Sequence, residues 1–186
     1  MDEIFATFGQ KSVGFGERLG AQYANIELGV YVVLGFTLPL LLPSSQLLTG
    51  TAVNAFLVLG ALHFRNWNLA PIAFLPSIAA LLSGMLFGPF TPFLLYMLPF
   101  IWTGNLLLIY LMKKLHLEKG FGYSGALVVS VLAKSALLFA SAFLLLKFGL
   151  VPSAFLTAMG VVQVATGLMG GVVALLLRSS LPHLLK

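Results

Sequence analysis

The sequence predicts an all-α membrane protein built as a single bundle of six transmembrane helices. Of its 186 residues, 60% are hydrophobic and 8% are charged, whereas an ordinary soluble domain carries about 25% charged residues. The mean hydropathy is +1.05. The apolar residues also fall into six runs, most of them near the length that a helix needs to cross a hydrocarbon core about 30 Å thick. The chain is long enough for one compact bundle and not for two domains.

Residues 1–25 are expected to form an amphipathic segment on the membrane surface. Ile4, Phe8, Phe15 and Leu19 recur at helical spacing, with charged residues at other positions, a pattern typical of interfacial helices. The chain starts with acidic residues, whereas a cleavable signal peptide starts with positive charge. This segment therefore does not resemble a signal peptide.

Six spanning helices are expected to follow and to form one transmembrane domain, residues 26–178, with a short cytoplasmic tail at 179–186. Most prolines and glycines in this domain fall at the edges of the apolar runs, where helices end. The expected helices are 26–42, 46–64, 69–87, 91–112, 124–148 and 152–177.

The basic residues predict the orientation of this bundle. Cytoplasmic segments of membrane proteins carry an excess of lysine and arginine. Of the ten such residues, Lys147 would lie on one side, Lys134 within a helix, and the rest on the opposite side. Both termini are therefore expected in the cytoplasm, and the protein is expected to be a multi-pass protein of the cell membrane. The eight residues on the cytoplasmic side are Lys11, Arg18, Arg65, Lys113, Lys114, Lys119, Arg178 and Lys186.

Lys134 lies near the middle of the fifth run, close to the midplane of the membrane. A charge at that depth costs from about 2.5 kcal/mol upwards, so something must compensate it. The only acidic residue in any run is Glu27, at the cytoplasmic start of the first. Two solutions follow: Lys134 is neutral in the empty protein, or its partner is an anionic ligand such as a carboxylate.

Other polar residues are expected at a similar depth. Asn54, Asn105 and Gln163 lie near the middle of the second, fourth and sixth runs, and Trp102 is close to Asn105 in sequence. Together with Lys134 they could line a shared interior that binds a substrate. The alternative is that the amides only hydrogen-bond between helices, which contributes about 0.6 kcal/mol per contact.

Two runs carry rows of small residues. Small residues let helix backbones approach closely where no hydrophobic effect favours association. The rows either pack inside the bundle or dock another membrane protein. They are Ala73, Ser77, Ala80 and Gly84 in the third run, and Gly160, Gly167, Gly171 and Ala174 in the sixth.

Several function classes find no support in the sequence. There is no cysteine, which excludes disulfides, zinc-thiolate sites and thiol catalysis. The motifs H-E-x-x-H and G-x-S-x-G and paired carboxylates are also missing, so we expect no enzyme activity and no metal or cofactor. The basic residues are scattered between apolar runs, which argues against nucleic-acid binding.

A group of short motifs resembles a known family. The stretch from Gln46 to Met112, with parts of the last run, resembles the substrate-binding (S) components of energy-coupling factor (ECF) transporters. The motifs are Gln46-Leu-Leu-Thr-Gly, Val53-Asn-Ala, Leu75-Pro-Ser, Leu98-Pro-Phe-Ile-Trp-Thr-Gly-Asn, Met159-Gly-Val-Val-Gln and Gly170-Gly171.

The resemblance implies a function. Such proteins bind a vitamin or similar micronutrient and associate with a membrane-embedded T component and two ATPase subunits. The ligand would lie between the loop joining the first two helices and helices four to six. With the polar residues above, this makes Gln46, Asn54, Trp102, Asn105, Lys134 and Gln163 the candidate substrate-binding residues.

The docking surface departs from the family pattern. The family often carries an alanine-x-x-x-alanine pattern in the first helix, and this chain lacks it there. The row Ala73, Ser77, Ala80 and Gly84 is the better small-residue face and the candidate for docking. The alternative function is that of a structural or assembly protein that packs a larger membrane complex through such faces.

Overall fold

The computed structural model describes residues 25–42, 45–64 and 69–180, and within these ranges it contains helices and connections but no β-strand. The N-terminal segment 1–24 and the tail from residue 181 lie outside the described residues, so the interfacial segment stays a prediction. The elements are a first helix Asn25–Leu41, α2 Gln46–His63, α3 Ala70–Ser83, the 3₁₀-helix η1 Gly88–Phe93, α4 Leu94–Met112, the π-helical turn η2 Lys113–Glu118, α5 Tyr123–Lys147, α6 Ala154–Met159 and α7 Val161–Ser180.

The all-α class predicted from the sequence is confirmed for the described residues, and four helical stretches are long and apolar enough to cross a membrane. The first helix and α3 are apolar but shorter, so six spans remain a prediction. The four long stretches are Gln46–His63, Gly88–Glu118, Tyr123–Lys147 and Ala154–Ser179.

The third helix is shorter than the predicted 69–87, and the reason is local. Gly84 caps α3 in the left-handed conformation, with φ 67°, which ends an α-helix by turning the chain out of its axis. A second positive-φ glycine, Gly88, follows at φ 56°, and the chain then forms η1 rather than an α-helix. The predicted sixth helix is likewise two helices, α6 and α7, because the backbone at Gly160 leaves the helical conformation.

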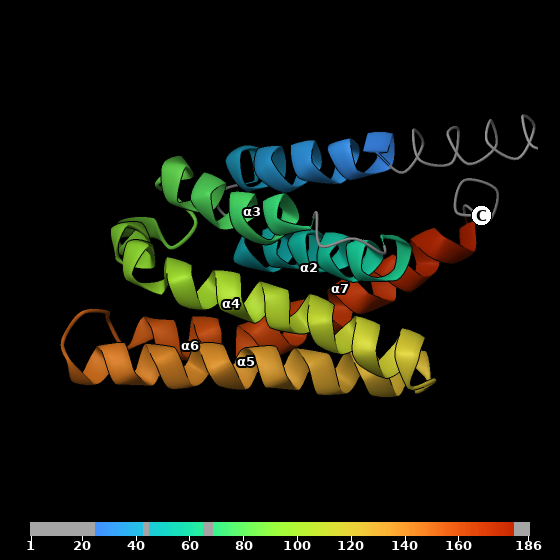
Figure 1. Ribbon diagram of the computed structural model, residues 1–186. Coiled ribbons are helices and arrows are strands. Elements are labelled where there is room, and N and C mark those ends of the chain that lie inside the picture. The colour runs from blue at the N-terminus through green and yellow to red at the C-terminus, as the bar shows by residue number, and fades with distance from the viewer. Residues whose placement is uncertain (1–24, 43–44, 65–68, 181–186) are drawn as a thin grey trace, which may run out of the picture.

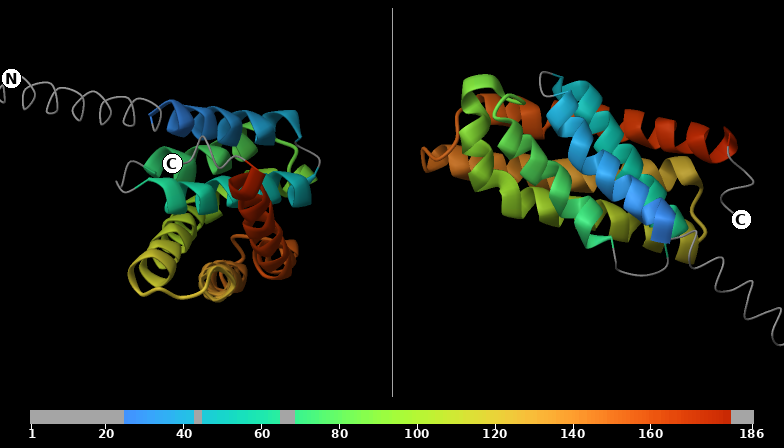
Figure 2. Two further views of the ribbon diagram at one scale, coloured as in Figure 1. Left: turned by 90° about the vertical axis from the view of Figure 1, so that its right-hand side faces the viewer. Right: turned by 90° about the horizontal axis from the view of Figure 1, so that it is seen from above.

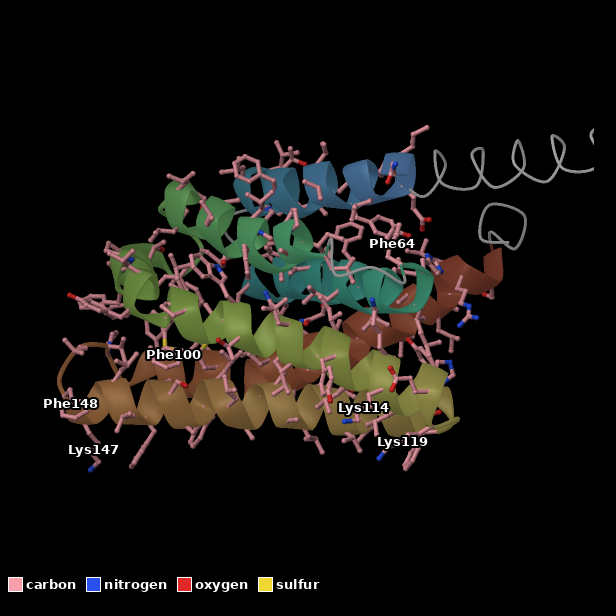
Figure 3. All side chains as sticks on the ribbon, viewed as in Figure 1. Phe64, Phe100, Lys114, Lys119, Lys147 and Phe148 are labelled. Atoms are coloured by element: carbon pink, nitrogen blue, oxygen red, sulfur yellow. The ribbon has the colours of Figure 1, made fainter. Side chains whose placement is uncertain are left out.

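Figure 1 shows the helices packed as one bundle. In Figure 2 the first helix lies on the outside, against α2 and α3, and α5 lies on the opposite side of the bundle; the right-hand view shows that the first helix and α2 cross α5 obliquely. Lys147 and Phe148 mark one end, here named the Lys147 end, and Lys114 and Lys119 mark the other, named the Lys119 end (Figure 3). These three lysines therefore divide between the two ends in the sense that the positive-inside pattern predicts.

Glycines in α7 allow three helices to pack closely. A Cβ added to Gly170 would lie 2.7 Å from Asn54 Cβ and 2.8 Å from the backbone nitrogen of Ala55, so α2 and α7 touch through their backbones. A Cβ at Gly167 or Gly171 would overlap side chains of α5. Three residues of the small-residue row of the last predicted helix therefore pack inside the bundle, namely Gly167, Gly171 and Ala174, whereas Gly160 lines a surface groove.

The small-residue row of α3 also faces the interior. Ala73 is fully buried, and Ser77 and Ala80 are buried as well, while Gly84 caps the helix. Ala73 packs in one apolar cluster and Ala80 in another. The docking role suggested for Ala73, Ser77, Ala80 and Gly84 therefore does not fit this structure, because three of the four side chains are covered by the protein's own helices.

We expect Gly170→Ala to lower stability by about 1–3 kcal/mol, the usual cost of overpacking a tight contact. The new methyl group would press on the backbone of α2. Thermal unfolding in detergent measures the effect. Gly125→Ala is the matched control, because Gly125 lies in α5 with nothing within 4 Å of its added Cβ. Equal unfolding temperatures for the two variants would contradict the close approach of α2 and α7.

Candidate functional site

A cavity of about 80 Å³ lies inside the bundle, and each of the α-helices α2 to α7 contributes to its wall. It extends from Gln46, the first residue of α2, to Lys134 near the middle of α5. It therefore reaches from the Lys147 end of the bundle into the interior. The polar residues of its wall are Gln46, Thr49, Asn54, Ser77, Asn105, Lys134, Gln163 and Thr166.

The polar residues lie between two apolar clusters. On α5, Leu127 and Val131 belong to one cluster and Leu138 to the other, with Lys134 between them. On α4, Asn105 likewise lies between the two clusters. Met97 belongs to the cluster of Leu138, and Leu108 and Ile109 belong to the cluster of Leu127 and Val131. The apolar clusters on both sides restrict water, so electrostatic interactions at this level are stronger than at a protein surface.

Lys134 is compensated by an amide rather than by an acid. Its side chain is buried, with 4% exposed, and its Nζ donates a hydrogen bond of 2.7 Å to Asn54 Oδ1. A lysine ammonium carries three N–H donors, and Asn54 accepts one of them. Lys134 also lines the cavity, so its remaining donors are available to a ligand there.

A second set of contacts orients the amide of Asn54. Its Nδ2 donates to the carbonyl oxygen of Gly50 at 2.9 Å and to Thr166 Oγ1 at 3.2 Å. Thr166 Oγ1 in turn donates to the carbonyl oxygen of Val162 at 2.8 Å. With both amide hydrogens directed at acceptors, Asn54 Oδ1 faces Lys134. The network joins α2, α5 and α7 through their polar groups.

No carboxylate of the described residues pairs with Lys134. Within the described ranges, Glu27 accepts a hydrogen bond from Tyr31 and pairs with His63 Nδ1 at 2.8 Å, and His63 ends α2 far from Gln46. Among the described residues, the cavity wall holds one basic side chain, Lys134, and no acidic one. The site therefore has positive character, and a negatively charged group is the ligand chemistry that it favours.

Gly104 of α4 makes room for the stem of Lys134. A Cβ at Gly104 would lie 3.4 Å from Lys134 Cγ and 3.4 Å from Leu138 Cγ. The methylene groups of the lysine thus pack against the α4 backbone, which directs the ammonium group across the bundle toward Asn54.

Asn105, Ser77 and Trp102 link α4 to α3. Asn105 Nδ2 donates to the carbonyl oxygen of Ala73 at 2.7 Å. Trp102 Nε1 donates to Ser77 Oγ at 2.9 Å, and its ring packs on Phe74 with the ring centroids 5.1 Å apart. Asn105 and Ser77 line the cavity, whereas Trp102 does not. Trp102 therefore positions Ser77 instead of contacting the cavity itself.

The two glutamines lie nearer the Lys147 end. Gln46 Nε2 is 3.5 Å from the carbonyl oxygen of Ala158, a weak hydrogen bond at the distance limit. Gln163 lines the cavity one helical turn before Thr166. The Gln46 amide can therefore reorient toward a ligand at low cost.

The structure brings five of the six candidate substrate-binding residues to one cavity: Gln46, Asn54, Asn105, Lys134 and Gln163. Trp102 is the exception. Sequence reasoning did not single out Thr166 and Phe87 as binding residues, although both line the cavity. Thr166 follows Gln163 by three residues on the same helix, a spacing that could have revealed it. No comparable pattern marks Phe87, which lies in the connection before η1.

Comparisons of the chain with protein-family models, with curated protein sequences and with solved structures found no match. The resemblance to ECF S components therefore stays a prediction from the sequence motifs.

We expect Asn54→Ala to destabilise the protein by more than about 2 kcal/mol, because it leaves a buried ammonium group without its acceptor. Lys134→Met removes that need. The double variant should therefore be no less stable than Asn54→Ala alone. Its loss of stability is then smaller than the sum of the two single losses, which shows that Lys134 and Asn54 interact. Thermal unfolding of the four proteins measures it. Strictly additive losses would show that Lys134 and Asn54 do not depend on each other.

Proposed function

We propose that this protein is the substrate-binding membrane subunit of an ECF-type uptake transporter for a vitamin or related small micronutrient that carries an acidic group. Its partners would be a T component and two ATPase subunits, which supply the energy from other chains. The proposal includes six spanning helices in the cell membrane, with both termini and the Lys119 end in the cytoplasm.

The observation that carries the proposal is the position of the Lys134 ammonium group. It is buried at mid-bundle, contacts a neutral amide, and lines a cavity that reaches the Lys147 end. A buried charge within a membrane protein usually marks a substrate or ion pathway. The end that the cavity reaches is the one with fewer basic residues, which the positive-inside rule assigns to the outside. An uptake protein must collect its substrate there.

The composition of the cavity also favours an external source of energy. Carriers driven by protons or sodium ions commonly use an acidic residue within the membrane. The described cavity wall contains amides, hydroxyls and one lysine and no carboxylate. Such a wall is suited to binding a ligand. The sequence motifs that resemble S components agree with a protein that binds the substrate while other subunits supply the energy.

A second candidate function, a structural or assembly role, is favoured by one surface feature. An apolar groove of about 670 Å³ runs between α5 and the α6–α7 pair, with small residues in its wall. Ser135 Oγ is buried in this groove and has no hydrogen-bond partner. A helix of a neighbouring membrane protein could fill such a groove. This role needs no ligand at Lys134, so ligand binding distinguishes the two candidates.

Lys134→Met should weaken binding of the substrate by about tenfold or more, because it removes one charge-assisted contact. A thermal-shift panel of vitamins and related carboxylic acids, with neutral amides or alcohols as matched analogues, identifies a ligand. Its affinity is then measured on both proteins. Lys147→Met is the control, because this lysine lies at the end of α5 away from the cavity wall.

If the ligand is an acid and binds Lys134→Met as tightly as it binds the unmodified protein, the anion site at Lys134 is wrong. The assignment to an ECF-type transporter has a separate test. Purification of the tagged protein from its native membrane should recover a T component and two ATPase subunits. Purification without them, combined with a panel that yields no ligand, would contradict the transporter proposal.

A further inference from the structure

A second cavity adjoins the Lys134 cavity at the Lys147 end of the bundle. It measures about 320 Å³, and its wall includes Phe90 of η1, with Phe155 and Thr157 of α6. It shares three wall residues with the first cavity, namely Gln46, Phe87 and Val162. The two cavities are therefore separated only by a thin partition of side chains. We name the Lys134 cavity the inner cavity and its neighbour the outer cavity.

The partition is held weakly. Gln46 crosses from α2 to α6 by a single hydrogen bond to the carbonyl oxygen of Ala158, at the limiting length of 3.5 Å. A bond of that length contributes little, and the glutamine side chain can rotate about several bonds. Among the three shared wall residues, Gln46 is also the polar one. A ligand group that passes between the cavities would displace Gln46 and could take its hydrogen bond.

The two cavities differ in chemistry. The inner one holds the ammonium group of Lys134 and the amides of Asn54, Asn105 and Gln163. The outer one is aromatic: Phe87 and Phe155 stack with their centroids 5.2 Å apart and their planes at 20°, and Phe90 adds a ring that is 41% exposed. Phenyl faces and edges favour a flat apolar group, most of all another aromatic ring.

We propose that the outer cavity is a second subsite of the same ligand, which holds an aromatic ring while Lys134 holds an acidic group at the other end. The substrate class is then a small aryl-substituted carboxylate. This inference rests on the proposed function, because it assumes that the inner cavity binds the acidic group. Beyond the proposed function, the inference assigns an aromatic ring to the ligand and places that ring toward the Lys147 end. It also assigns Phe90 as a residue that determines specificity.

The ligand pair valerate and 5-phenylvalerate tests the subsite, since the two acids differ only in the ring. Equilibrium binding is measured on protein in lipid nanodiscs. We expect 5-phenylvalerate to bind at least about tenfold more tightly than valerate, from burial and stacking of the ring. Phe90→Ala should remove most of that difference and leave valerate binding unchanged. Lys134→Met should weaken binding of both acids.

Two further variants control for altered folding. Phe90→Trp keeps an aromatic ring and should retain the preference for 5-phenylvalerate. Phe148→Ala removes an exposed ring at the same end that does not line either cavity, and it should change nothing. Loss of the preference in Phe148→Ala, or its retention in Phe90→Ala, would overturn the assignment of the ring to the outer cavity.

The outcomes separate this inference from the proposed function. If both acids bind equally well and both depend on Lys134, the aromatic subsite is wrong and the anion site stands. If neither acid binds, or if binding of both is the same in Lys134→Met, the anion site itself is wrong and the subsite is overturned with it.

Discussion

The hydrogen bond between the Lys134 ammonium group and the Asn54 amide is the contact on which the arrangement of the bundle depends. An ammonium group in the middle of an apolar helix must have a polar partner. Asn54 can serve because Gly50 and Thr166 hold its amide in one orientation. Those contacts require α2, α5 and α7 to lie close together, and the glycines of α7 permit this. One buried charge thus constrains three helices.

The same interaction explains why a cavity exists at this level. The Asn54 amide accepts one hydrogen bond from Lys134, so the amino group can still donate to a further partner in the cavity. The polar side chains at this level line the space between the helices, whereas the apolar side chains gather above and below it. The apolar clusters on either side consist of buried side chains. The space left between them is lined by polar side chains, with Lys134 among them, and extends to Gln46 at the start of α2.

Much of this site was predictable from the amino-acid sequence, and the remainder has identifiable causes. The depth of a residue follows from its position in an apolar run, so the sequence alone assigns Lys134, Asn54, Asn105 and Gln163 to one level. Rotation about each helix axis depends on tertiary packing. Trp102 therefore points to Ser77 instead of the cavity, and the row on α3 faces inward. The early end of α3 depends on the left-handed conformation of Gly84. The second break falls at Gly160, where an added Cβ would lie 2.8 Å from the carbonyl oxygen of Leu156 and 3.0 Å from the ring of Phe139.

The most direct test asks whether the cavity is reached from outside the cell. Because the chain has no cysteine, Gln163→Cys introduces a single thiol into the cavity wall. A membrane-impermeant, negatively charged thiol reagent is added to intact cells, and to inverted membrane vesicles in parallel. An outward-facing anion site at Lys134 predicts modification in intact cells, faster with the anionic reagent than with a cationic one of equal size. Modification only in inverted vesicles, or a preference for the cationic reagent, would contradict it.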